Sequence, residues 1–274
     1  MGKLSIVAEN LWLDHILKVA VFTPTGDIYL ALSTADFTED GSGAAEPVAM
    51  NYSRTDLATP FGEVAGTVAR QIKNDALITC PTASGDWGTI THWAIFDHIT
   101  AGRLLAYGAF DVGKSVTNGQ TPKVAIDEIV ISVPTHTTYG MTDFCAEEML
   151  DMTFLDTNPT YTPGAVWVGL GTAAFNDAGS MTNECAYTGA YTRLQHEGTA
   201  NWDTAAASVT ANKTAITFIT ATGSWGTVSH YMLTTVETED AGDMLLFGVW
   251  DTPNAIIADD QVNIPIGDLD ITMS

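Results

Sequence analysis

Basic residues are scarce in this 274-residue chain, and their scarcity narrows what the chain can bind. Lysine and arginine together number 10, against 33 acidic residues, which gives a formal net charge of −23. Such a charge repels phosphate backbones and anionic lipid, so we expect neither nucleic-acid binding nor docking to a membrane. The charge fits instead a surface that maintains solubility or matches a basic protein partner.

Cysteine is also rare, with only Cys80, Cys145 and Cys185. An odd count without regular spacing argues against a disulfide framework, so we expect small buried thiols in a protein that folds in a reducing compartment. No basic segment followed by an apolar stretch opens the chain, and no apolar run approaches about 18 residues. The sequence therefore predicts neither a signal peptide nor a membrane-spanning helix.

The motifs of common catalytic sites are missing as well. The chain has no nucleophile elbow, no phosphate-binding loop and no dinucleotide-binding fingerprint. Three acids in one polar loop, Asp36, Glu39 and Asp40, lack the spacing of a calcium-binding loop, and the second half keeps only Asp177 there. We therefore predict no catalytic residues, no cofactor and no metal site, and a protein that is not an enzyme.

What the chain does contain is an internal repeat. Residues 78–93 (ITCPTASGDWGTITHW) match residues 216–231 (ITFITATGSWGTVSHY) at nine of sixteen positions, with a shift of 138. Unrelated segments would match at about one position, so a duplication is the better explanation. Further matches join 26–32 with 164–170, 52–54 with 191–193, and, at a shift of 140, 101–108 with 241–248. We predict two tandem domains, residues 1–136 and 137–274.

Apolar periodicity predicts the elements of each copy. Helical spacing covers residues 4–20 and, ahead of the second copy, residues 143–155. Each helix is expected to pack on its own domain, with a neighbouring subunit as the alternative. Alternating apolar residues predict strands in the first copy at 27–33, 51–57, 67–73, 75–79, 89–96, 103–110 and 122–133, with a polar loop at 34–48. The predicted fold is mainly β: two tandem antiparallel β-sandwich, jelly-roll-like domains, each preceded by one short amphipathic helix.

Four aromatic, arginine and histidine positions recur in both copies and form a candidate structural motif. They are Tyr52, Arg54, Trp87 and His92 in the first copy and Tyr191, Arg193, Trp225 and His230 in the second. A tyrosine and an arginine two residues apart in a strand share one face, so we expect the arginine to lie over a tyrosine packed at a sheet edge. The histidines lie beside aromatic residues in a strand and are expected in the core rather than as bases or ligands. The tryptophans follow turns, which fits a plug at the end of a sandwich, with sugar stacking as the alternative.

Five segments of the first copy carry a resemblance to a known family: 13–17 (LDHIL), 28–35 (IYLALSTA), 52–54 (YSR), 87–97 (WGTITHWAIFD) and 102–108 (GRLLAYG). With these segments and their counterparts, each half resembles a family of tailed-bacteriophage virion proteins of the Gp80-like or "phage tail fibre" type, to which capsid cement proteins are related. The second copy departs from it at Thr234 and Thr235, which replace the Phe-Asp after the histidine strand, and in its opening helix at 144–150 (FCAEEML).

The resemblance implies a structural function in the virion, after assembly in the host cytoplasm, with no catalytic residues to carry over. We expect a capsid decoration, or cement, protein that stabilises contacts between coat subunits, because the chain has no coiled-coil or collagen-like shaft. The alternative is a tail-fibre or baseplate-associated protein that binds a host surface glycan. The expected partners are the major capsid protein or other virion proteins, and the expected assembly is a homo-oligomer, for example a trimer.

Overall fold

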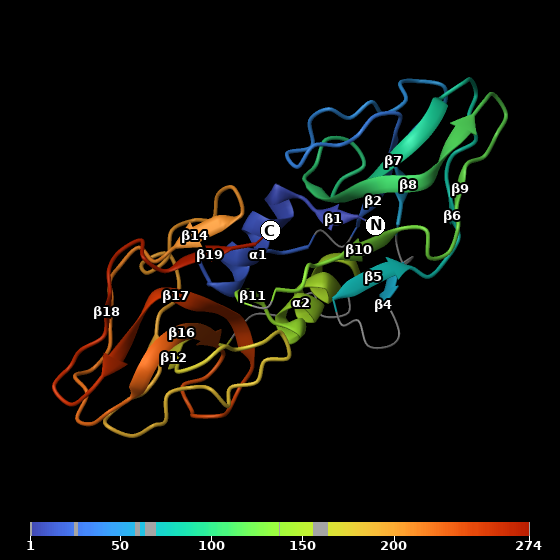
Figure 1. Ribbon diagram of the computed structural model, residues 1–274. Coiled ribbons are helices and arrows are strands. Elements are labelled where there is room, and N and C mark those ends of the chain that lie inside the picture. The colour runs from blue at the N-terminus through green and yellow to red at the C-terminus, as the bar shows by residue number, and fades with distance from the viewer. Residues whose placement is uncertain are drawn as a thin grey trace. The chain divides into compact units, whose positions relative to one another are not determined.

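The computed structural model describes residues 2–24, 27–57, 61–63, 70–136, 138–155 and 164–273 (Figure 1). Within these residues it has nineteen strands, two α-helices and one π-helical turn, so the protein is mainly β, as predicted. Every pair of named strands is antiparallel. Part of the strand predicted at 67–73 lies outside the described residues. In the part of the chain that is described, no helix has the length and apolar character needed to cross a membrane.

The first set of strands forms three sheets. The largest has the order β1 (Lys3–Leu4), β8 (Leu104–Val116), β7 (Gly88–Phe96), β2 (Tyr29–Ser33) and β3 (Thr55–Asp56). The second sheet consists of β10 (Val130–Ser132), β5 (Gln71–Asn74) and β4 (Phe61–Glu63), and the third pairs β6 (Ile78–Thr79) with β9 (Lys123–Val124).

The second set repeats this arrangement strand by strand. Its five-stranded sheet has the order β11 (Gly140–Met141), β17 (Met244–Ile256), β16 (Gly226–Thr234), β12 (Trp167–Gly171) and β13 (Leu194–Gln195). The smaller sheets pair β14 (Val209–Ala211) with β19 (Asp270–Thr272), and β15 (Ile216–Thr217) with β18 (Asn263–Ile264). Among the described residues, β4 alone has no counterpart strand in the second set.

The long central hairpin shows that the two copies share irregularities as well as order. The β7–β8 register shifts between Ile90 and His92, and the β16–β17 register shifts between the corresponding Val228 and His230. A bulge of this kind bends a strand at a fixed place, and its repetition at the same position supports a duplicated fold. Sequence matching and strand pairing therefore give the same alignment of the two copies.

The turn of this hairpin explains why the sequence shift changes along the chain. Phe96 pairs with Leu104 across the first turn, and Thr234 pairs with Met244 across the second. The second turn is therefore two residues longer, which changes the shift from 138 to 140. Surface turns tolerate such insertions, because few buried contacts depend on their length.

A buried loop residue covers the same place in both large sheets. Phe37 is 2% exposed and packs edge-on against Phe96, with 6.2 Å between ring centroids. Phe175, at the corresponding position, is also 2% exposed and joins a cluster with Met232 and Met244. The predicted polar loop at 34–48 thus contributes an aromatic side chain to the core.

Both helices begin with a capping hydroxyl. The Ser5 hydroxyl oxygen accepts the backbone N–H of Ala8 at 3.1 Å at the start of α1 (Ile6–Ile16). Thr142 accepts the N–H of Cys145 at 3.3 Å at the start of α2 (Asp143–Leu150), which continues as a π-helical turn, Asp151–Leu155. The first helix is shorter than the predicted 4–20, because Lys18 adopts a left-handed φ of 60° just beyond it.

The structure divides into two compact units, and each unit contains a segment that belongs by sequence to the other copy. Unit 1 comprises Met1–Glu9, Thr23–Val133 and Met149–Thr160, and unit 2 comprises Asn10–Phe22, Pro134–Glu148 and Tyr161–Ser274. The C-terminal part of α1 is thus a component of unit 2, although by sequence it lies within the first copy. The division at 136/137 remains a prediction about the repeats, and each unit takes segments from both sides of it.

Hydrogen bonds show how the segment 10–22 belongs to unit 2. The Asn10 side-chain oxygen accepts the N–H of Ser208 at 2.8 Å, and the Asp14 carboxylate accepts the N–H of Ala205 at 2.7 Å. The carbonyl of Leu17 accepts the N–H of Gly198 at 2.8 Å. Residues 12–17 are all buried, so this part of the helix lacks the solvent-facing side expected of an amphipathic helix. Figure 1 shows α1 beside β14 and β19.

Two predicted strands were placed incorrectly. Residues 51–57 form only β3, because residues 49–51 adopt left-handed backbone conformations that interrupt an extended chain. Residues 122–133 form β9 and β10, which belong to different sheets and are separated by a turn in which Asp127 has a φ of 66°. The strand predicted at 103–110 is real but continues to Val116.

The three cysteines are buried free thiols, as predicted. Burial raises the pKa of the Cys80 thiol, and burial together with the neighbouring Glu184 carboxylate raises that of Cys185 to about 12. Both thiols therefore stay protonated near neutral pH and are poor nucleophiles.

Candidate functional site

A buried polar cluster in unit 2 is built around Arg193. Its Nε donates to Glu184 Oε1 at 2.8 Å and its Nη2 donates to Glu184 Oε2 at 2.7 Å, which is a bidentate ion pair. The two side chains are 0% and 2% exposed. The Tyr191 hydroxyl lies 3.2 Å from Glu184 Oε1 and accepts the N–H of Leu170 at 2.7 Å. The cluster therefore ties strand β12 to the loop that follows it.

Arg193 also holds the turn of the long hairpin. Its Nη1 donates to the carbonyls of Val236 at 2.8 Å and Ala241 at 3.1 Å, and to the Thr234 hydroxyl at 3.2 Å. A buried guanidinium is tolerated only when its donors are satisfied, and these contacts, together with that of Nη2 to Met181 Sδ at 3.1 Å, satisfy them. The arrangement holds three separate chain segments together and leaves no free donor for a ligand.

Unit 1 contains the same cluster in a more exposed form. Arg54 pairs with Glu46 at 2.8 Å, with side chains 11% and 23% exposed, and donates to the carbonyls of His98 at 3.0 Å and Ala101 at 2.6 Å. Its guanidinium lies 3.6 Å from the centroid of the Phe96 ring, a cation–π geometry. Tyr52 bonds to Glu46 at 2.7 Å.

The glutamates are the members of this cluster that sequence reasoning missed. Glu46 and Glu184 are separated by the same shift of 138 as the matched repeat segments, so the signal was present. They were overlooked because both lie in loops without strand or helix periodicity. We name the two groups the clamp clusters: Tyr52, Arg54 and Glu46 in unit 1, and Tyr191, Arg193 and Glu184 in unit 2.

The tyrosines of the clamp clusters are held neutral. Burial, reinforced by the neighbouring carboxylate, raises the pKa of Tyr52 and that of Tyr191 well above the usual value. Neither hydroxyl is prepared to act as a base or a nucleophile, since its ionised form is disfavoured. The chemistry available to the clamp clusters is hydrogen bonding that holds loops.

The two repeated tryptophans are buried beside the clamp clusters. Trp87 donates from Nε1 to the carbonyl of Met50 at 2.9 Å and is 5% exposed. Trp225 donates to the carbonyl of Gly189 at 2.8 Å and is 3% exposed. Each indole packs edge-on against the clamp tyrosine, with 5.2 Å between ring centroids. Rings buried in this way present no face on which a sugar from solvent can stack.

The repeated histidines have local hydrogen bonds. His92 Nδ1 lies 2.8 Å from the Thr91 hydroxyl, and its Nε2 lies 3.6 Å from the Asp36 carboxylate. His230 Nδ1 lies 2.7 Å from the Ser229 hydroxyl, and burial lowers its pKa. Among the described residues, no group of three or more histidine, cysteine or acidic side chains is arranged to hold a metal ion.

A third histidine gives unit 2 a pH-dependent stability. His196 is 4% exposed, its Nε2 lies 3.1 Å from the carbonyl of Asn201, and burial lowers its pKa. The folded state thus binds fewer protons than the unfolded state, so the stability contribution is complete above the unfolded pKa of about 6.5 and is lost as the pH falls below it. We expect wild type to lose unfolding free energy in urea titrations between about pH 7 and about pH 5, and His196→Gln to lose less. His98→Gln, at an exposed histidine, is the control; identical pH slopes for wild type and His196→Gln would contradict this account.

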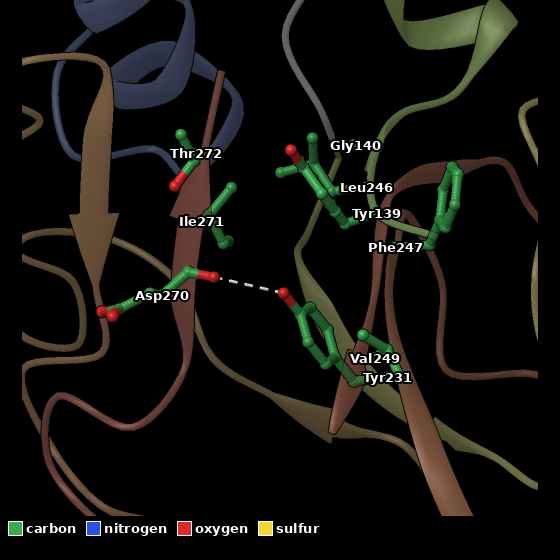
Figure 2. Close-up of a pocket in the computed structure, with 9 residues that line it drawn as sticks. All are labelled: Tyr139, Gly140, Tyr231, Leu246, Phe247, Val249, Asp270, Ile271 and Thr272. Carbon is green, nitrogen blue, oxygen red and sulfur yellow. Dashed lines mark hydrogen bonds between the residues drawn. The ribbon is translucent and has the colours of Figure 1, made fainter. Parts of the chain in front are cut away.

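A pocket of about 240 Å³ marks a difference between the units. Figure 2 shows its lining in unit 2, where the Tyr231 hydroxyl donates to the carbonyl of Asp270 at 3.2 Å. In unit 1 the corresponding carbonyl, that of Val130, accepts the backbone N–H of Gly2 at 2.7 Å. A Cβ at Gly2 would lie 2.2 Å from Trp93, so only glycine fits there. In unit 1 a main-chain hydrogen bond thus joins Gly2 to β10, whereas in unit 2 a tyrosine side chain of β16 bonds to the corresponding strand, β19.

Comparison with known proteins agrees with the duplicated structure. A search of curated proteins finds no match. A family model described as "Podophage GP4 fiber I protein gp80" matches residues 3–132 and, a second time, residues 140–272. These two matched regions coincide with the two sets of sheets. The chain therefore belongs to the family of the podophage GP4 fiber I protein gp80, as a phage virion structural protein with two tandem copies of the family's domain.

Proposed function

We propose that this virion protein decorates the capsid and stabilises contacts between coat subunits. The observation that carries the proposal is the repetition of one sheet order and one strand register within a single chain. Two similar sets of surfaces on one chain suit two similar neighbours, and a capsid shell presents many copies of one coat protein. Buried area added across such seams would oppose their separation.

The lengths of the elements support decoration over a long fibre shaft. The longer of the two described α-helices has 11 residues, which is about three turns and too few for a coiled-coil shaft. The clamp clusters, of which the one in unit 2 is almost fully buried, instead hold loops against sheets, which favours fixed surfaces. The expected partners are the major capsid protein or other virion proteins, and a homo-oligomer such as a trimer would place six similar domains in a ring.

We also propose that the protein catalyses no reaction. The support is the state of its candidate groups: the clamp tyrosines are held neutral, and the buried thiols of Cys80 and Cys185 have raised pKa values. A tyrosine or cysteine that serves as a base or nucleophile near neutral pH needs a lowered pKa instead.

The second candidate function is a tail-fibre or baseplate-associated protein that binds a host surface glycan. The observation that favours it is the description of the matching family, which names a fiber protein. The loops at 35–48 and 175–187 are the segments we would assign to such binding. A glycan array probed with the full chain tests this alternative, which requires a saturable signal from a defined sugar.

The decoration proposal makes a prediction for particles assembled without this protein. We expect them to release DNA at a lower temperature and to resist osmotic shock less well, because contacts across coat seams are lost. The measurement is dye uptake during heating of purified particles, with purified protein added back as the control. Unchanged thermal and osmotic resistance would contradict the proposal.

A further inference from the structure

A lysine in unit 1 is held by an aromatic ring, a carboxylate and a main-chain carbonyl. Lys114 lies on β8, and its ammonium group is 2.6 Å from Glu128 Oε1 and 3.2 Å from the carbonyl of Lys123. The ammonium also lies over the ring of Phe110, 5.1 Å from its centroid. The site thus combines an aromatic face, a carboxylate and a main-chain carbonyl, which together are suited to a primary ammonium ion.

Strand register identifies the same position in unit 2. Lys114 pairs with Ile90, and Asn254 pairs with Val228, which is the counterpart of Ile90. By the same alignment Trp250 replaces Phe110, Asn263 replaces Lys123 and Asp268 replaces Glu128, all at a shift of 140. The aromatic face, the carboxylate and the carbonyl are therefore kept in unit 2, while the lysine is lost.

A buried asparagine fixes the turn that carries the carboxylate in each unit. Asn74 is 0% exposed, accepts the N–H of Ile129 at 2.8 Å and donates to the carbonyl of Ala125 at 2.7 Å. Asn212, also 0% exposed, makes the same pair of bonds with Leu269 at 2.9 Å and Pro265 at 2.8 Å. The carboxylates within these turns, Glu128 and Asp268, therefore occupy corresponding places.

The missing lysine leaves a groove of about 300 Å³ in unit 2. Its lining includes Val228, Trp250, Thr252, Asn254, Asn263 and Asp268. This volume is at the small end of the range of ligand sites, about 300–1,000 Å³, and suits a single side chain. The groove is also open to solvent along its rim, since Thr252, Asn254, Asn263 and Asp268 are exposed.

We propose that this groove binds a lysine side chain of a protein partner, in the place that Lys114 fills in unit 1. The lysine stem would lie along Trp250, and its ammonium would meet Asp268 and the carbonyl of Asn263. The net charge of −23 favours the approach of a basic surface. The identity of the donor as a coat protein rests on the proposed function, whereas the lysine site itself does not.

The test uses the full chain and a small probe, Nα-acetyl-lysine methylamide. The probe is titrated into isotope-labelled protein, and the indole N–H resonance of Trp250, assigned with Trp250→Phe, is followed by NMR. Nα-acetyl-norleucine methylamide, which has the stem without the ammonium group, is the control ligand. We expect a saturable shift with the lysine probe and binding about tenfold weaker with norleucine, since the cation–π contact and ion pair are removed.

Two variants make the result specific. Asn254→Lys should fill the groove as Lys114 does and abolish binding of the probe. Asp268→Asn removes an exposed carboxylate and should weaken binding about tenfold without unfolding unit 2. Equal binding of norleucine, the absence of a saturable shift, or unchanged binding by Asn254→Lys would each overturn the proposal. Because no particle enters this experiment, its outcome is separate from that of the capsid-stability test.

Discussion

Replacing Arg193 with alanine is expected to destabilise unit 2 by about 3–5 kcal/mol, the usual cost of removing one partner of a buried ion pair. The carboxylate of Glu184, 2% exposed, would lose both of its charged donors. The carbonyls of Val236 and Ala241 would lose a donor as well. The measurement is urea unfolding of the full chain, followed by hydrogen exchange of strands β16 and β17.

The two copies provide a matched control for this prediction. Arg54→Ala removes the corresponding residue of unit 1, where the paired side chains are 11% and 23% exposed, so we expect a smaller cost of about 1–2 kcal/mol. The double variant Arg193→Met with Glu184→Leu should recover much of the loss, because no buried charge is left unpaired. Equal losses for Arg193→Ala and Arg54→Ala would contradict the assignment of a buried pair to unit 2.

Replacing Leu17 with alanine is expected to destabilise unit 2 by about 2–5 kcal/mol, because it leaves a cavity in a fully packed site. Leu17 is 0% exposed, and its carbonyl accepts the N–H of Gly198 at 2.8 Å. By sequence Leu17 lies within the first copy, so without the exchange of segments the damage would be expected in unit 1. Hydrogen exchange distinguishes the two outcomes, since we expect faster exchange at residues 196–212.

Two variants serve as controls for the exchanged segments. Val21→Ala lies in the same segment but is 74% exposed, so it should change stability by less than about 0.5 kcal/mol. Phe154→Ala should destabilise unit 1 instead of unit 2, although Phe154 follows the first copy in sequence. Phe154 belongs to unit 1, and its ring centroid lies 6.1 Å from that of Phe61. Faster exchange at 70–79 is expected for this variant. If Leu17→Ala loosened strands β7 and β8 instead, the segment assignment would be wrong.

The duplication, the β class and the central hairpin could be predicted from the sequence because they depend on local patterns. Alternation at 89–96 identified β7 almost to the residue, and Gly88 only extended it. Strand length was harder to predict, since β8 continues past Phe110 through residues of mixed polarity that are fixed by pairing with Gly88–Ile90. Pairing with a distant strand has no signal within a short window.

Segment exchange and the open groove could not be predicted, for a different physical reason. A helical pattern shows which residues of 4–20 are apolar but does not identify the sheet that buries them. The groove at Asn254 depends on which residue faces Trp250 and Asp268 across two strands and a turn. Once register is known, the replacement of Lys114 by Asn254 becomes visible, because the same site can be compared within one chain.

The most direct test of the central claim is a cryo-electron microscopy map of intact particles combined with a count of copies per particle. A capsid decoration protein requires density for both β units on the shell, at seams between coat subunits, with copies in the hundreds. Density confined to the tail, with at most a few tens of copies, would contradict decoration and favour the fibre alternative. Absence of the protein from purified particles would contradict a structural function in the virion altogether.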